Sequence, residues 1–478
     1  MKKEAIFHRT YSEYSFAEAA DLVVIRLRAA KADLESCTLC FGDRMEPKSP
    51  ISITEAEMTL RFSDAMFDYF EVEIDPGVTR LCYYFRLSSG GEALYYYSDC
   101  FHEQPEENRQ LYYNFHYIRS EDMDSVPDWW RKAVVYQIFP DSFASSRRRI
   151  SCESRVEHLP DGQACASKLG GTLRGVTENL DYIASLGFNC IYLTPIFAAN
   201  SPHKYDTIDY FEIDPCFGSK DDLRRLVSGC HERGMRLVLD GVFNHVGRGF
   251  WAFQDVLANR EQSPYRDWFY IDFGRDNGYG DGLWYEGWEG HFELVKLNLR
   301  NPAVVEHLFY NIREWVNQFG IDGLRLDVAY CLDRDFLRRL RTFCDALKPE
   351  FLLLGEALFG DYNQLVNHEM LHSCTNYECY KGIYSSLNEL NFFEISYSLN
   401  RQFGPENWAL YQEKHLLSFI DNHDVSRIAS ILKEKRHLPL AFALLFGMPG
   451  IPCVYYGSEW GTRADKSQGD PALRPCFE

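Results

Sequence analysis

The sequence G-L-R-L-D-V-A at residues 323–329 ends an apolar run with a charged pair, Arg325 and Asp327. The run Ile321–Leu326 reads as a buried parallel strand. Side chains two positions apart on a strand point to the same face, so the Arg325 cation would hold the Asp327 carboxylate ionised. The alternative is a structural salt bridge. The pattern predicts a buried strand that delivers an ion pair at its carboxyl end.

Three more segments have the same form, namely D-G-V-F-N-H (240–245), L-L-G-E-A (353–357) and F-I-D-N-H-D (419–424). Each follows or completes an apolar run. A single carboxylate of this kind is usually a strand cap. Four such segments in sequence are typical of a barrel, because the carboxyl ends of barrel strands converge on one mouth and carry the catalytic groups there.

Strands and helices alternate through the larger part of the chain, which predicts a (β/α)8 barrel of the TIM type. The third strand is followed by about 58 residues, 243–300, rich in glycine and aromatic residues. Helices are expected over 172–186, 219–233, 301–319 and 334–347. The eight expected strands are 132–139, 190–195, 235–242, 322–328, 351–357, 371–378, 416–422 and 453–457.

Residues 1–120 predict a β-sandwich instead, because strand-like runs alternate with turn signals such as P-G and S-G-G. An acidic linker, residues 121–127, ends in proline, so we expect the barrel domain to occupy residues 121–478, with 243–300 as a domain inserted into it. The expected sandwich strands are Asp21–Leu27, Ala56–Phe62, Phe67–Ile74, Leu81–Leu87 and Ala93–Tyr97.

Bulk composition excludes several classes of function. A net charge of −20 argues against nucleic acid or an anionic membrane as a partner. No apolar stretch forms a signal peptide or a membrane span. Fifteen scattered cysteines suit free thiols in a reducing compartment, so a cytoplasmic location is expected. Cys37 and Cys40 form a C-x-x-C pair, but a zinc site needs four ligands.

Together these segments resemble the α-amylase superfamily, glycoside hydrolase family 13, from about residue 128 to the last residue. The segments L-V-K-L-N-L-R-N (294–301) and G-I-P-C-V-Y-Y-G-S-E (450–459) support the match. The N-terminal part resembles the sandwich module of neopullulanases, cyclomaltodextrinases and maltogenic amylases. In this family the insertion at 243–300 is called domain B. The sequence ends at F-E, so the eighth barrel helix and the C-terminal β-domain of the relatives are expected to be missing.

The resemblance implies the chemistry of retaining glycoside hydrolysis. Asp327 matches the nucleophile, Glu356 the general acid/base and Asp424 a third carboxylate that binds sugar hydroxyls. Two such carboxyl groups should lie about 5–5.5 Å apart. Crowding of carboxylates would raise one pKa, as a general acid working near neutrality requires.

Further residues match substrate-binding positions of the family. Tyr205, in H-K-Y-D-T, resembles the tyrosine that stacks on the −1 sugar. His245 and His423 resemble the histidines that hydrogen-bond its hydroxyls. Arg325 belongs to this set through its contact with the nucleophile, and Asp240 is expected to organise the network around Arg325. Each of these residues alone would more commonly be a packing residue.

No cofactor is expected to be required. Asn244 matches a position that ligates calcium through its amide oxygen in many α-amylases. Sandwich-bearing relatives often carry an ion-binding loop after the first barrel strand, but here that loop, residues 142–150, reads S-F-A-S-S-R-R-R-I. Three arginines are a poor substitute for hard oxygen ligands, so no ion is predicted there.

The implied substrate is an α-glucan oligosaccharide, namely a maltooligosaccharide, a cyclodextrin or pullulan, cleaved at α-1,4 bonds, with α-1,6 bonds as a further candidate. A glucanotransferase is the alternative, and a non-catalytic carbohydrate-binding homologue is a remote one. The family's V-A-N-E and W-H become Val328–Cys331 and Ala357-Leu358 near the expected aglycone sugar, which leaves the preferred substrate open. The sandwich module implies a homodimer. In the loop 272–291, three aromatic residues form either the substrate rim or the core of the insertion: Trp284, Tyr285 and Trp288.

Overall fold

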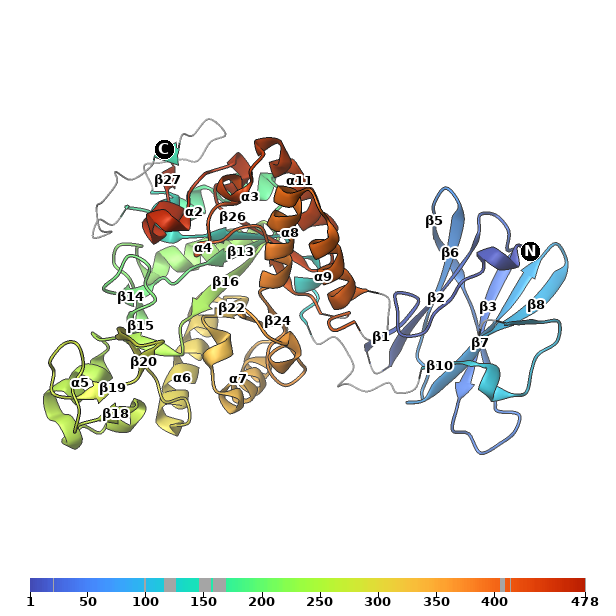
Figure 1. Ribbon diagram of the computed structural model, residues 1–478. Coiled ribbons are helices and arrows are strands. Elements are labelled where there is room, and N and C mark those ends of the chain that lie inside the picture. The colour runs from blue at the N-terminus through green and yellow to red at the C-terminus, as the bar shows by residue number, and fades with distance from the viewer. Residues whose placement is uncertain are drawn as a thin grey trace. The chain divides into compact units, whose positions relative to one another are not determined.

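The computed structural model describes residues 1–19, 21–98, 100–115, 126–145, 156–157, 169–404, 409–412 and 414–477 (Figure 1). The chain divides into two compact units, one formed mainly by residues 1–125 and the other by residues 126–404 and 408–478. Most of the expected linker and Arg147–Arg149 of the expected loop lie outside the described residues. No helix among those described is long and apolar enough to cross a membrane.

The first unit is a sandwich of two antiparallel sheets. One sheet has the strand order β1-β2-β6-β5, and the other has β4-β3-β7-β8-β9 with β10 beside β7. Alternate side chains of the two sheets, such as Ile25 of β2 and Phe85 of β7, share one core. The strands are β1 Ser15–Ala19, β2 Leu22–Ala30, β3 Ser36–Asp43, β4 Thr54–Glu57, β5 Thr59–Ser63, β6 Phe67–Ile74, β7 Leu81–Ser89, β8 Glu92–Tyr97, β9 Cys100–His102 and β10 Tyr113–Phe115.

The single strand expected over 56–62 was wrong. The run is broken at Met58 into β4 and β5, which belong to different sheets. The Met58 side chain is buried in the core between the sheets, and its sulfur lies 3.3 Å from the sulfur of Cys37. The chain therefore crosses from one sheet to the other at this residue, and a continuous apolar pattern does not reveal such a crossing.

The C-x-x-C pair lies on one strand, β3, with its two thiols in different places. Cys37 packs into the core between the sheets, whereas Cys40 packs into a second cluster with Tyr84 and Tyr97. Residues three apart on a strand point to opposite faces, so these thiols cannot bind one ion. Neither Cys37 nor Cys40 is in a disulfide bond.

His8 is buried in the sandwich as a neutral ring. Its Nδ1 lies 2.7 Å from the carbonyl oxygen of Arg26, so Nδ1–H donates there. Its Nε2 lies 2.9 Å from the hydroxyl of Tyr83, which donates to Oγ of Ser15 at 2.9 Å. Burial lowers the pKa of His8 to about 3, so the ring is neutral.

We therefore expect the first unit to lose stability in acid through His8. Its folded pKa lies below the usual unfolded value of about 6.5, so the unfolded chain binds the extra proton. The contribution is complete above pH 6.5 and falls as the pH drops toward 3, by about 5 kcal/mol at most. Hydrogen exchange of β2 and β7 amides across this range should show the loss, and His8→Gln should flatten the pH dependence. An unchanged slope would contradict the assignment.

The second unit contains an eight-stranded parallel barrel with the order β24-β23-β22-β16-β13-β11-β26-β25. A parallel bridge between Thr375 and Leu417 joins the two end strands. All eight expected strands are present: β11 Val135–Ile138, β13 Cys190–Leu193, β16 Arg236–Gly241, β22 Gly323–Leu326, β23 Leu352–Gly355, β24 Ser373–Cys374, β25 Leu417–Phe419 and β26 Ile451–Tyr455.

Helices cover the outside of this barrel (Figure 1). Ser219 caps α4 with a capping box, and Asn301 and Gly320 bound α6, as the sequence predicts. The helix expected over 172–186 is instead two short helices that meet at Asn179. The helices are α1 Pro140–Phe143, α2 Leu173–Glu178, α3 Leu180–Ser185, α4 Lys220–Glu232, α6 Pro302–Phe319, α7 Arg334–Leu347, α8 Tyr377–Glu389, α9 Phe393–Phe403, α10 Ile428–Ile431 and α11 Leu438–Gly447.

The segment between β16 and α6 folds into short elements of its own, grouped to one side of the barrel in Figure 1. It contains β17 His245–Gly247, α5 Trp251–Asn259, β18 Ile271–Asp272, β19 Trp284–Tyr285, β20 Gly287–Trp288 and β21 His291–Lys296. The strand order β17-β21-β20 ties its two ends together. The remaining strands are β14 Phe197–Ala199 paired with β15 Thr207–Ile213, and β12 Val156–Glu157 paired with β27 Cys476–Phe477.

Candidate active site

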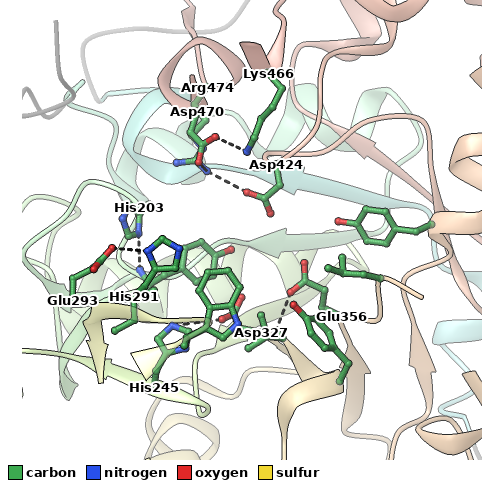
Figure 2. Close-up of a pocket in the computed structure, with 17 residues that line it drawn as sticks. His203, His245, His291, Glu293, Asp327, Glu356, Asp424, Lys466, Asp470 and Arg474 are labelled. Atoms are coloured by element: carbon green, nitrogen blue, oxygen red, sulfur yellow. Dashed lines mark hydrogen bonds and ion pairs between the residues drawn. The ribbon is translucent and has the colours of Figure 1, made fainter. Parts of the chain in front are cut away.

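A cavity of about 430 Å³ receives the strand-end carboxylates (Figure 2). Asp327 follows β22, Glu356 follows β23 and Asp424 follows β25. Figure 2 shows Asp424 facing Asp327 and Glu356 across the cavity. Of the other predicted residues, Tyr205 and His245 line the cavity, while Arg325, His423 and Asp240 lie buried behind its wall.

Arg325 joins three carboxyl groups. Its Nη1 donates to both oxygens of Asp240 at 3.0 Å and to Oδ1 of Asp327 at 2.9 Å. Its Nη2 lies 2.9 Å from Oε1 of Glu356. The second oxygen of Glu356 accepts from the backbone N–H of Val328 at 2.9 Å. One guanidinium thus sets the relative positions of Asp327 and Glu356 on neighbouring strands.

The turn after β22 is strained. Val328 has a φ of +41°, a left-handed conformation that is costly for a β-branched residue. This conformation accompanies the hydrogen bond from Val328 to Glu356. A strained backbone conformation of this kind costs about 1–3 kcal/mol and persists only where the surrounding contacts stabilise it. Such conformations are concentrated at functional sites.

A chain of hydrogen bonds runs behind the cavity. The amide nitrogen of Gln137 donates to Nδ1 of His423 at 2.8 Å, so the proton of that ring is on Nε2. Nε2 lies 2.7 Å from the hydroxyl of Tyr205, which donates to Asp240 at 3.1 Å. The hydroxyl of Tyr192 also donates to Asp240, at 2.6 Å. Tyr205 is therefore held edge-on by its hydroxyl while its ring borders the cavity.

His245 presents an unused donor. The side chain is 2% exposed, and its Nδ1 accepts from the amide of Asn244 at 3.1 Å. The proton is therefore on Nε2, which has no hydrogen-bond partner among the described residues and lies 3.8 Å from Oδ2 of Asp327. Burial lowers the pKa of His245 to about 3, so the ring is neutral. A buried donor without a partner is costly unless a ligand completes it.

The carboxyl groups of the site are electrostatically distinct. Burial raises the pKa of both Asp327 and Glu356, and the Arg325 cation opposes the rise. Burial also raises that of Asp424, but the nearby basic groups, of which His423 and Arg474 contribute most, together lower it by more, so its pKa is below the usual range. Asp240, Asp327 and Glu356 surround a single cation. Three carboxylates would carry more negative charge than one guanidinium balances, so the three carboxyl groups together favour retaining a proton.

Several cavity residues were missed by sequence reasoning. Arg474, whose Nη2 lies 3.3 Å from Oδ1 of Asp424, and its neighbours Lys466 and Asp470 line one wall from the segment after β26. Charged residues in an irregular segment carried no signal of this role. Gln137 and Tyr192 lie within β11 and β13, where a polar group inside an apolar run was the available signal.

The three aromatic residues of the loop 272–291 have different positions. Trp288 lines the cavity and stacks on His291, with ring centroids 5.7 Å apart. Tyr285 is fully buried and packs against Phe253 in the core. The guanidinium of Arg275 lies over the ring of Trp284, with its Cζ atom 4.6 Å from the ring centroid. The loop therefore contributes to both the rim and the core.

Asn244, which matches a calcium-ligating position, is buried, and the nitrogen of its side-chain amide donates to His245. In the part of the chain that the structure describes, no three His, Cys, Asp or Glu side chains are grouped as metal ligands.

The fold and the strand-end carboxylates define a barrel glycosidase. Residues 137–472 match the alpha amylase catalytic domain, and residues 1–119 match the alpha amylase N-terminal ig-like domain. The chain belongs to the α-amylase family and is a glycoside hydrolase of that family.

Three similar proteins cover the whole of this chain. A cyclomaltodextrinase of Geobacillus thermopakistaniensis (strain MAS1) is 36% identical, with 81% of its own length covered. An intracellular maltogenic amylase of Bacillus subtilis (strain 168) is 32% identical, also with 81% covered. A solved structure titled cyclomaltodextrinase is 33% identical, with 81% of that chain covered and a TM-score of 0.69. These proteins are named for hydrolysis of α-glucans.

Proposed function

We propose that this protein hydrolyses α-1,4-glucosidic bonds with retention of configuration, and that α-1,6 bonds are a further candidate. The observation that carries the proposal is the bridge of Arg325 to both Asp327 and Glu356 at the edge of a sugar-sized cavity. Retention requires a nucleophile and an acid that flank the scissile bond about 5–5.5 Å apart. Asp424, on the opposite wall, is the third carboxylate and binds sugar hydroxyls.

In the first step, Glu356 donates its proton to the glycosidic oxygen as the bond from that oxygen to C1 breaks. The Asp327 carboxylate attacks C1 and forms a covalent glycosyl ester. The Arg325 cation stabilises the ionised form of Asp327 before the attack. Burial favours a proton on the carboxyl group of Glu356, and this is the proton that Glu356 donates as the general acid.

In the second step, Glu356 acts as a base. Water attacks C1 of the ester, its proton passes to Glu356, and the bond from C1 to Asp327 breaks. His245 Nε2–H, His423 and Tyr205 bind the sugar of the intermediate, and Asp240 holds Arg325 and Tyr205 in place. No step needs a cofactor.

A glucanotransferase uses the same residues, with a sugar hydroxyl in place of water. The names of the relatives favour hydrolysis, and they favour maltooligosaccharides, cyclodextrins or pullulan as substrates. A non-catalytic carbohydrate-binding homologue would have no need of a nucleophile and an acid on one guanidinium. We keep transfer as the second candidate, because it requires the same nucleophile and the same acid.

The enzyme is expected to prefer small or cyclic glucans to starch. Initial rates on β-cyclodextrin, maltotriose, pullulan and soluble starch, measured in parallel with chromatography of the products, test this. We expect kcat/KM for β-cyclodextrin to exceed that for starch, in line with the relatives that are named cyclomaltodextrinase. A preference for starch would reject the substrate proposal. Products with more sugar units than the substrate would favour transfer.

We further propose the domain roles that the family resemblance implies. Residues 1–120 would form a carbohydrate-binding-like module that dimerises the protein, and residues 243–300 an inserted domain B on a barrel of residues 121–478. Sedimentation of the full chain tests for the dimer. A cytoplasmic location is supported by the free cysteines and by the intracellular relative.

A further inference from the structure

Two aromatic side chains follow the two central carboxylates at the same spacing. Tyr330 comes three residues after Asp327, and Phe359 comes three residues after Glu356. The strands that precede them, β22 and β23, are hydrogen-bonded neighbours. The two rings consequently meet, with centroids 5.7 Å apart and planes inclined by 46°. Tyr330 lines the cavity, as does Leu358, the residue before Phe359.

Phe359 is unusual in its exposure. The side chain is 73% exposed although it stands next to a cavity-lining residue. Tyr330 is half-buried and held in place: it lies in the turn after the strained Val328, and its hydroxyl is 3.5 Å from a carboxylate oxygen of Glu289 on the β20–β21 hairpin. A ring that is fixed on one side and open on the other is suited to stacking.

The side chains that line the cavity are of two chemical kinds. Lys466, Asp470 and Arg474 are charged, and Arg474 contacts Asp424. Trp288, Tyr330 and Leu358 are mainly apolar. An α-glucan in the cavity therefore meets both charged hydrogen-bonding groups and ring faces.

The position of Glu356 decides where the leaving sugar binds. In the proposed mechanism its carboxyl group protonates the oxygen of the leaving sugar, so that sugar must lie on the Glu356 side. The geometry points to Tyr330 and Phe359 as a stacking platform that binds the leaving-group sugar of the α-glucan. This inference rests on the proposed function and assigns substrate selection to two residues of this chain. The apolar C–H face of a pyranose packs on such rings while its hydroxyls remain in water.

The test compares two substrates that share a maltosyl group but differ in leaving group. Maltotriose releases glucose, which would occupy the platform. α-Maltosyl fluoride releases fluoride, which has no ring to stack. Phe359→Ala should lower kcat/KM for maltotriose by about 3- to 10-fold, in line with one aromatic contact, and should change kcat/KM for the fluoride less than about twofold.

Matched variants separate stacking from other effects. Phe393→Ala removes an equally exposed phenylalanine, 75% exposed on α9, and should leave both substrates unaffected. Tyr330→Phe keeps the ring and should retain most of the maltotriose activity, whereas Tyr330→Ala should lose it as Phe359→Ala does. Phe359→Leu keeps an apolar side chain without a ring and should also be impaired on maltotriose.

Several results would overturn the inference. They are an equal loss on both substrates, no loss on maltotriose in Phe359→Ala, or a Phe359→Leu variant with wild-type preference. Phe359 is exposed, so melting temperatures should not differ between variants, and kinetic changes then report the cavity. A wild-type protein that cleaved neither substrate would contradict the proposed function itself.

Discussion

Replacing Asp327 with alanine is expected to lower kcat on maltotriose by about 10⁴-fold or more, the scale seen when a covalent nucleophile is removed. Without this carboxylate no glycosyl ester can form. The fold should persist, because the change removes one negative group from a set of three carboxyl groups around the Arg325 cation. Rates and melting temperatures of the purified variant measure both effects.

A reaction with azide tests whether Asp327 acts as the nucleophile. In Asp327→Ala a small anion can enter the vacated face of C1 and displace the leaving group once, so the glycosyl azide should have inverted configuration. The matched control, Asp335→Ala, removes an exposed aspartate of α7 and should be as active as the wild type. Near-wild-type turnover of Asp327→Ala, or an azide product with retained configuration, would refute the assignment.

Replacing Glu356 with alanine is expected to have the second large effect on activity. We expect kcat/KM for maltotriose to fall by about 10³-fold, within the range for a lost general acid. The loss on α-maltosyl fluoride should be far smaller in the first step, because fluoride leaves without a proton. Pre-steady-state release of fluoride and steady-state release of glucose measure the two cases.

Azide distinguishes the acid from the nucleophile. In Glu356→Ala the anion takes the place of water and attacks the Asp327 ester, so two displacements occur and the glycosyl azide should retain its configuration. Glu369→Ala removes a surface carboxylate paired with Arg338 and serves as the control. Equal losses on maltotriose and the fluoride would contradict the role of Glu356 as the acid.

Local pattern was enough to locate the elements of the barrel. The eight strands were predicted because each is a short apolar run, buried on both faces, that a turn or a capped helix follows. Ser219 and Asn301 could be identified as helix starts because a cap acts within four residues of the chain. Where the structure depends on packing between distant parts of the chain, as at Met58, the local pattern gave a wrong prediction.

The candidate site was predictable in its residues but not in its contacts. Asp327, Glu356 and Asp424 are visible because each ends an apolar run, and one fold brings such ends together. The bond from Gln137 to His423 joins residues 286 positions apart, and no local pattern encodes it. The same is true of the Arg474 contact with Asp424, which comes from an irregular segment.

The sequence by itself therefore determined the class of fold, the order of its strands and the charged residues at their ends, since burial and capping act on neighbouring residues. Only the tertiary structure decided what those residues do to one another. The three carboxyl groups on Arg325, the unused Nε2–H of His245 and the pairing of Tyr330 with Phe359 all arise when strands distant in sequence become neighbours in the barrel. Distances of this kind are set by packing across strands, and an apolar pattern along a single strand contains no information about them.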